Sequence, residues 1–184
     1  MMPTHPIDTP FWDFSLDVYG REGVEEECLK LQELLNLDVN LLLFAAYVGA
    51  VEGVGLKRED IAAANAAIVG WHGEIVRSLR NARRALRPAS TDAGNPLREA
   101  SATLRTLVKT AELEAEKIEH AILWQTLHRQ LVVRSCIDRD RALAVNLRSV
   151  LEFYGAASSE SKASVPRLLE AATACAQVHE AKGE

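Results

Sequence analysis

The sequence predicts an all-α fold: a single-domain bundle of five or six helices with two long antiparallel helices and a loosely attached C-terminal helix. Apolar residues recur at three- and four-residue steps almost throughout the chain, a spacing typical of amphipathic helices. No segment shows the strict alternation of a half-buried strand. Of the 184 residues, 48% are hydrophobic and 26% are charged, which excludes a largely disordered chain. We expect residues 1–155 to form the bundle and residues 156–184 to form a linker and a tail helix.

A capping residue and apolar spacing predict the first two helices. Thr9 is a favourable N-cap, and Pro10 follows it at the first helical position. Gly20 is a stop signal, so a short helix is expected between these points. A second helix is expected over residues 23–35, where apolar side chains again recur with helical spacing.

The third predicted helix, over residues 39–51, is apolar on every side. Asp38 can cap its N-terminus. A helix that is hydrophobic all round is expected in the interior, so we place it at the centre of the bundle. Its apolar run of residues 41–51 is about half of the roughly 20 residues that cross a bilayer, and we expect no membrane span.

Two long helices follow, over residues 58–86 and 96–133. The connection between them, residues 87–95, is rich in residues that favour turns. Such a connection favours an antiparallel hairpin.

The remaining sequence predicts one more core helix and a tail. Ser135 or Asp138 can cap a helix that continues to about Tyr154. Residues 155–164 are small and polar, which predicts a linker. Residues 165–181 are rich in alanine and only weakly amphipathic, so we expect a helix that docks loosely or not at all.

The first long helix carries a seam in strict four-three alternation, the pattern of a helix packed along a partner. Asn65 and His72 interrupt this seam. A buried polar group needs a hydrogen-bond partner, so both residues are either satisfied core groups or parts of a functional site. The seam comprises Ile61, Asn65, Ile68, His72, Ile75, Leu79, Ala82 and Leu86.

The second long helix carries an acidic edge whose members step by four and three residues. In an antiparallel hairpin, we expect His72 to lie near Glu112. The same register places Asn65 near Glu119 and His120. The candidate polar cluster is therefore Asn65, His72, Glu112, Glu116 and Glu119.

Three interpretations of this cluster remain open. It can be a hydrogen-bonded structural anchor, or an acidic helix edge paired with Lys109 and Lys117. It can also hold a single divalent ion through His72, Glu112, Glu116 and His120. The Glu-x-x-His spacing of di-iron and di-manganese bundles does not occur at His72 or His120. We assign no metal ligand and expect no cofactor.

Further along the second long helix, Trp124 and Leu127 lie on an apolar face nearly opposite to the face assigned to the hairpin. An apolar face left open in the monomer would mark an interaction surface. We therefore expect an unknown protein partner or a homodimer.

Arginines form a stripe at the end of the first long helix: Arg77, Arg80, Arg84 and Arg87. Such a stripe can bind phosphate, nucleic acid or an acidic protein surface. The sequence pI of about 5.6 is far from the basic values typical of nucleic-acid-binding domains, so we do not expect nucleic acid as the partner.

The spacing of the cysteines and the absence of known catalytic motifs limit the cellular compartments and the reactions that are expected. Cys28, Cys136 and Cys175 are far apart and show no zinc or disulfide-framework spacing. The N-terminus lacks the pattern of a signal peptide, and we expect a cytoplasmic location. No nucleophile elbow, phosphate loop or dinucleotide-binding glycine motif occurs, so the sequence favours a non-catalytic protein.

Six blocks of sequence stand out together: Phe11-Trp-Asp-Phe14, Leu37-Asp-Val-Asn-Leu-Leu-Leu-Phe44, Trp71-His72, Leu79-Arg80, Arg83-Arg84 and Ala111-Glu-Leu-Glu-Ala-Glu116. They resemble a family of short, uncharacterised proteobacterial proteins with a domain of unknown function, and the likeness extends from Phe11 to Leu123. The resemblance implies a bacterial cytoplasmic protein with no established activity, cofactor or catalytic residue. It also implies a glutamine-like residue at position 120, where this chain has histidine.

The function that we predict is a helical interaction, adaptor or regulatory module. One alternative is a metal-binding or catalytic bundle that uses His72, Glu112 and Glu116. A second is phosphate or nucleic-acid binding through the arginine stripe.

Overall fold

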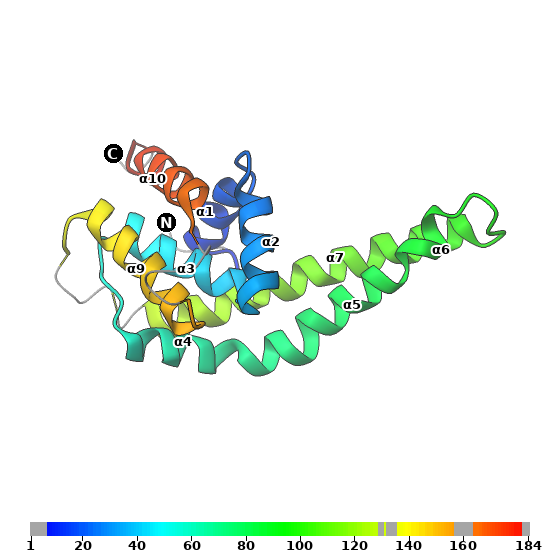
Figure 1. Cartoon of the computed structure of the whole chain (residues 1–184), viewed down its shortest axis with the longest axis horizontal. Helices are drawn as coiled ribbons and strands as arrows, with labels where there is room; N and C mark the ends of the chain where they lie inside the picture. Colours follow the sequence, from blue (N-terminus) through cyan, green and yellow to red (C-terminus); the bar gives the residue numbers. More distant parts are fainter. Residues whose placement is uncertain (1–6, 129–130, 132–135, 157–163, 182–184) are drawn as a thin grey trace. The chain divides into compact units, whose positions relative to one another are not determined.

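The structure is a computed structural model that describes residues 7–128, 131, 136–156 and 164–181 (Figure 1). These residues form helices joined by short connections, and none of them belongs to a strand, which confirms the all-α prediction. None of the helices described is long and apolar enough to span a membrane. The chain divides into two compact units. The core unit consists of the described parts of residues 1–67 and 120–184, and the hairpin unit consists of residues 68–119.

Of the three N-terminal helices, the first and the third begin where their capping residues predict. Thr9 Oγ1 accepts a hydrogen bond from the Trp12 N–H at 3.1 Å, and Asp38 Oδ1 accepts one from the Asn40 N–H at 2.8 Å. Both bonds satisfy backbone donors that a helix start leaves unpaired. The helices are α1 (Pro10–Tyr19), α2 (Val24–Leu35) and α3 (Val39–Ala50).

Helix α3 lies at the centre of the core unit, as its composition predicts. Every residue from 40 to 50 is buried. It packs along α9 (Arg139–Phe153), and α1, α2 and α10 (Pro166–Ala181) also contact it. Gly49 permits the close approach of α3 and α9, because a Cβ at this position would lie 2.5 Å from Leu143 Cα.

A buried amide joins α9 to the segment that follows α3. Asn146 is fully buried. Its Oδ1 accepts a hydrogen bond from the Leu56 N–H at 2.7 Å, and its Nδ2 donates to the Ala45 and Val54 carbonyls at 3.2 and 2.9 Å. Leaving such buried groups unpaired costs about 1–3 kcal/mol each, so this side chain holds the segment against α9.

The C-terminal helix α10 is packed more firmly than its sequence predicts. It contacts α1, α2, α3 and α9, and Leu168 and Ala172 are fully buried. The Glu27 carboxylate accepts hydrogen bonds from the Arg167 and Leu168 N–H groups at 3.2 and 2.9 Å, which caps the start of α10. The expectation of a loose attachment is therefore wrong, because small alanines pack closely without giving a strong apolar pattern.

Several predicted boundaries fall on residues outside the described ones. The expected end of the second long helix near Val133, the alternative cap Ser135 and residues 157–163 of the predicted linker are among them. The division of the chain after residue 155 stays a prediction. Asp138, the other expected cap, accepts a hydrogen bond from the Arg141 N–H at 2.9 Å and starts α9.

The two long helices meet in the hairpin unit, where α5 and α7 lie side by side and antiparallel (Figure 1). The core unit holds the start of α4 and the end of α7. The first arm consists of α4 (Arg58–Trp71), the π-helical turn η1 (His72–Val76), α5 (Arg77–Ala85) and the short α6 (Arg87–Thr91). The second consists of α7 (Arg98–Leu123), and a second π-helical turn, η2 (Trp124–His128), follows it.

The π turn η1 ends the predicted seam. The Arg77 N–H bonds to the His72 carbonyl, five residues back, so the turn holds one residue more than an α-helical turn. Ile75, the next seam position in sequence, is 38% exposed, whereas Val76 is fully buried.

Beyond the turn, the residues of α5 that reach α7 are shifted by one position. Arg80 and Arg83 donate hydrogen bonds to Glu112, in place of the apolar Leu79 and Ala82 that the seam predicts. The seam prediction is therefore wrong after His72.

Candidate functional site

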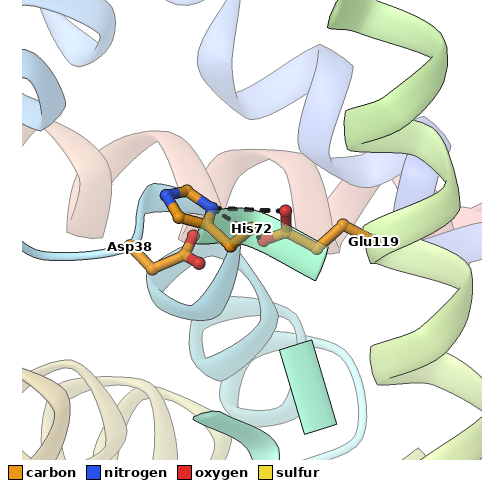
Figure 2. A group of neighbouring side chains, drawn as sticks. All are labelled: Asp38, His72 and Glu119. Atoms are coloured by element: carbon orange, nitrogen blue, oxygen red, sulfur yellow. Dashed lines mark hydrogen bonds and ion pairs between the residues drawn. The ribbon is translucent and has the colours of Figure 1, made fainter. Parts of the chain in front are cut away.

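His72 pairs with Glu119 within the hairpin unit (Figure 2). His72 Nδ1 lies 3.3 Å from both carboxylate oxygens of Glu119, whose side chain is fully buried. The expected pairing of His72 with Glu112 is wrong by about two helical turns, because α6 lengthens the first arm beyond the predicted connection. Figure 2 also draws Asp38, which belongs to the core unit and caps α3 there.

An imidazole beside a buried carboxylate can perform defined chemistry. The carboxylate orients the ring and fixes its tautomer, as it does for general bases and for metal-ligating histidines. The pair lies where α4 passes into the π turn, and π turns are frequent at functional sites. The neighbouring Trp71 Nε1 donates a hydrogen bond to the Ala115 carbonyl at 2.9 Å, which ties the same stretch of the first arm to α7.

Glu112 and Glu116 are engaged by arginines of α5. Arg80 donates to Glu112 Oε1 at 3.0 Å and to Glu116 Oε1 at 2.7 Å, and Arg83 donates to both oxygens of Glu112. Burial would raise the pKa of Glu112, but the hydrogen bonds from Arg83 and Arg80 lower it below its ordinary value. Glu112 and Glu116 are therefore members of an ion-pair network, which we call the arginine–glutamate network.

The polar residues of the core unit have partners other than the predicted ones. Asn65 Oδ1 accepts a hydrogen bond from the Tyr154 hydroxyl at 2.9 Å. His120 Nε2 lies 3.0 Å from Asn40 Oδ1, and the ring stacks on Phe11 with centroids 4.3 Å apart. Burial lowers the pKa of His120 to about 3. The imidazole is therefore neutral and donates to Asn40, as a glutamine amide would.

The predicted arginine stripe is interrupted at Arg80. The Arg80 side chain is only 16% exposed because it belongs to the arginine–glutamate network. Arg77, Arg84 and Arg87 are exposed, so three members of the stripe remain available to solvent.

The predicted interaction face around Trp124 is largely interior. Trp124 is half-buried and packs against Tyr47, with ring centroids 5.7 Å apart, and Leu131 is buried. Leu127 belongs to η2, but its side chain lies outside what the structure describes. The face is therefore not an open surface at Trp124.

An exposed apolar row that begins just before α7 and continues along it was not predicted as a surface. Leu97, Leu104 and Leu107 are 66%, 49% and 62% exposed. Together with Ala100 and Ala111 they follow the three-four spacing of a seven-residue repeat. This spacing is visible in the sequence, but the face around Trp124 and Leu127 was predicted as the interaction surface.

A second apolar row lies on α5 and continues the same surface. Because η1 rotates α5, its seam residues turn away from α7. With about 100° per residue and antiparallel chain directions, both rows fall on one side of the hairpin, and Arg77 and Arg84 fall on the other. We call this surface the apolar face; it comprises Ile75, Leu79, Ala82, Leu86, Leu97, Ala100, Leu104, Leu107 and Ala111.

Comparison with known proteins gives a family without a function. Residues 10–123 match the family described as "Protein of unknown function (DUF2390)". No curated protein and no solved structure matches the chain significantly. The matched segment contains α1 to α7, and therefore the complete hairpin unit.

Proposed function

The chain belongs to the DUF2390 family, and we propose that it is a non-catalytic helical interaction module that binds a protein partner through the apolar face. The observation that supports this function is the exposure of Leu97, Leu104 and Leu107 on one arm of the hairpin, beside the partly exposed Leu79 and Leu86 of the other arm. Exposed apolar patches of several hundred Å² are typical of interaction surfaces.

The interior of the hairpin supports the same role. The arginine–glutamate network joins α5 to α7 through charge-assisted hydrogen bonds, which have strong geometric preferences. Because this network holds the two helices in register, the apolar rows form a preorganised surface. Preorganisation reduces the entropic cost of binding.

Site-specific photocrosslinking in the native cell tests the proposed function. A benzophenone side chain placed at position 104 is expected to crosslink the protein to its partner, because Leu104 lies within the apolar face. The matched control is position 106, since Thr106 is exposed on the other side of the same helix. Absence of a product at position 104, or equal yields at both positions, would contradict the proposal.

A metal-binding function is the second candidate, and the buried pair of His72 and Glu119 favours it. The pair offers one nitrogen and one carboxylate ligand, fewer than the three or four protein ligands of typical zinc sites, so it ranks below the interaction module. Calorimetric titration of the metal-free protein with Zn²⁺ tests it. Binding that His72→Ala and Glu119→Gln remove and Glu114→Gln retains would support the site, and no heat of binding would exclude it.

We further propose that the protein is bacterial and cytoplasmic. The free state of Cys28, Cys136 and Cys175 supports a reducing compartment. Fractionation of the native cell tests the location, and recovery of the protein outside the cytoplasm would contradict it.

A further inference from the structure

We propose that the hairpin unit binds a small molecule carrying a diphosphate group, at a site between its two arms on the side opposite to the apolar face. Arg105 is the central residue of this site, and Arg84, Arg87 and Lys109 are its other members. The site does not depend on the proposed function, because it uses other residues and another side of the hairpin.

Arg105 is a half-buried cation on α7. Its Nε atom is buried and forms no hydrogen bond with any described residue. Its guanidinium group forms no ion pair within the described part of the chain either. Burying a charged donor without a partner is costly, and buried charges in proteins are normally paired. The position of Arg105 therefore favours a bound anion.

The carboxylates that face α5 are already engaged and do not neutralise Arg105. Glu112 accepts hydrogen bonds from Arg80 and Arg83, and Glu116 accepts one from Arg80. Residues 77–109 contain eight basic and two acidic residues. Apart from Arg80 and Arg83, none of these basic side chains forms an ion pair with a residue that the structure describes. The six that remain are Arg77, Arg84, Arg87, Arg98, Arg105 and Lys109.

Four of these six residues fall within a short length of the hairpin. The ion pair of Arg83 with Glu112 sets the register of the two arms, so residues 84–87 lie level with residues 108–111. With a rise of about 1.5 Å per residue, the four charged side chains originate within roughly 9 Å along the hairpin axis. We call this group the basic cluster; it comprises Arg84, Arg87, Arg105 and Lys109.

The members of the basic cluster also share one side of the hairpin. Counted at about 100° per residue, Arg84 and Lys109 fall on the side opposite to the apolar face. The same count places Arg87 and Arg105 toward the opposite arm, and Arg105 is accordingly half-buried. The four cations therefore converge between α5 and α7.

The composition of the basic cluster favours phosphate as the ligand group. The planar guanidinium group matches two phosphate oxygens at once, and a lysine ammonium adds a point charge. Like charges three or four residues apart repel each other on a helix, as Arg84 and Arg87 do on one arm and Arg105 and Lys109 on the other. An anion with several negative charges relieves this repulsion, and a single carboxylate relieves it less.

The charge of the whole chain favours a small ligand over a nucleic acid. Residues 77–109 are basic, but the net charge of the chain is -5, so its other parts repel an extended polyanion. A membrane is also disfavoured as the ligand. The exposed leucines that would enter a bilayer lie on the side of the hairpin away from the basic cluster.

Calorimetric titration of the full chain with pyrophosphate at low ionic strength tests the site. Arg105→Gln is expected to weaken binding by more than about tenfold, because it removes charge-assisted hydrogen bonds. Lys109→Gln, at an exposed position, should weaken binding by about threefold or more. The matched control is Arg148→Gln, which removes the same charge from an exposed position of the core unit and should change the affinity by less than about twofold.

Thermal unfolding separates a binding role of Arg105 from a structural one. Because the Arg105 Nε atom has no partner among the residues described, Arg105→Gln should not lower Tm in the absence of pyrophosphate. Pyrophosphate should raise the Tm of the wild type and of Arg148→Gln, and it should leave that of Arg105→Gln unchanged. A lower Tm of Arg105→Gln without pyrophosphate would identify a structural residue and overturn the proposal.

Two further ligands distinguish the source of the phosphate. A labelled single-stranded RNA and vesicles rich in phosphatidylserine are titrated with the same variants. Binding of either one that pyrophosphate does not displace and that Arg105→Gln abolishes would assign the basic cluster to nucleic acid or to membranes. No heat of binding with pyrophosphate, or equal weakening by Arg105→Gln and Arg148→Gln, would also overturn the proposal.

Discussion

In the core unit, apolar side chains surround α3, and buried polar groups such as Asn146 and His120 are neutral. In the hairpin unit, the charged side chains of Arg80, Arg83 and Glu112 lie between α5 and α7, while leucines are exposed on the outside. The core unit therefore gains stability from close apolar packing. The hairpin unit places charged side chains where a helix pair usually places leucine, and several of its leucines are exposed to solvent.

The largest effect is expected where the backbones of the core unit approach most closely. Gly49→Ala should destabilise the protein by about 3 kcal/mol or more, because its Cβ would lie 2.5 Å from Leu143 Cα and 2.7 Å from Leu143 N. Urea denaturation measures the free energy of unfolding. The matched control in the hairpin unit is Gly70→Ala, which meets nothing within 4 Å and should stabilise by up to about 1 kcal/mol. Equal changes in the free energy of unfolding at both positions would contradict the proposed difference in packing between the two units.

Loss of the buried amide should have the next largest effect. Asn146→Leu removes the partner of the Leu56 N–H and of two carbonyl groups, and we expect a loss of about 3 kcal/mol in the free energy of unfolding. Asn81→Leu, an exposed position on α5, serves as the control and should change stability by less than about 0.5 kcal/mol. A small effect of Asn146→Leu would show that other groups or water satisfy this backbone.

The neutral histidine should make the core unit sensitive to acid. The pKa of His120 is lowered to about 3 in the folded state, whereas an unfolded histidine titrates near 6.5. The unfolded chain then binds more protons between these values, so stability should fall by about 1.4 kcal/mol for each pH unit below 6.5. Between pH 7 and pH 5, the wild type should lose about 2 kcal/mol more than His120→Gln, as measured by urea denaturation. Parallel pH profiles for the two proteins would show that His120 is not held neutral.

The smallest of these effects is expected in the arginine–glutamate network. Glu112→Gln should cost about 1–2 kcal/mol, because Arg80 and Arg83 lose a shared carboxylate but keep some contact with solvent. The lowered pKa of Glu112 means that its contribution is present above the ordinary value of 4.5 and is lost as the pH falls below it. Thermal unfolding compares this variant with Glu114→Gln, an exposed control on the same helix. Equal melting temperatures would indicate that the network adds no stability.

Sequence reasoning succeeded where local chemistry determines the structure. Thr9 and Asp38 each precede an apolar segment and each cap the helix that follows. The segment of residues 39–51 is apolar on every side, which predicts its burial. It failed where the geometry of one turn propagates along a helix. The π turn of residues 72–76 has no distinct sequence signal. Because of this turn, Arg80 faces α7 at the position where the seam predicts Leu79.

The candidate site was predicted in part. His72 and an acidic residue of α7 do lie together, but the acid is Glu119. The register of the two arms depends on how many residues form the connection at the tip of the hairpin. Residues 87–91 were expected to belong to this connection, but they are helical. The exposed leucines of α7 were not predicted as a surface, because composition alone does not show which of two apolar sides of a helix faces its partner helix.

The wide turn at residues 72–76 also has an evolutionary meaning. It accommodates a single extra amino acid without disturbing the helices on either side. A homologue shorter by one position there, with an ordinary α-helical turn, would present its downstream guanidinium groups to the second arm in the same way. Insertion or deletion of one residue within this turn would therefore keep the outer leucines on the same side of the hairpin. An insertion or deletion elsewhere in the first arm would rotate the following residues to other sides of the helix.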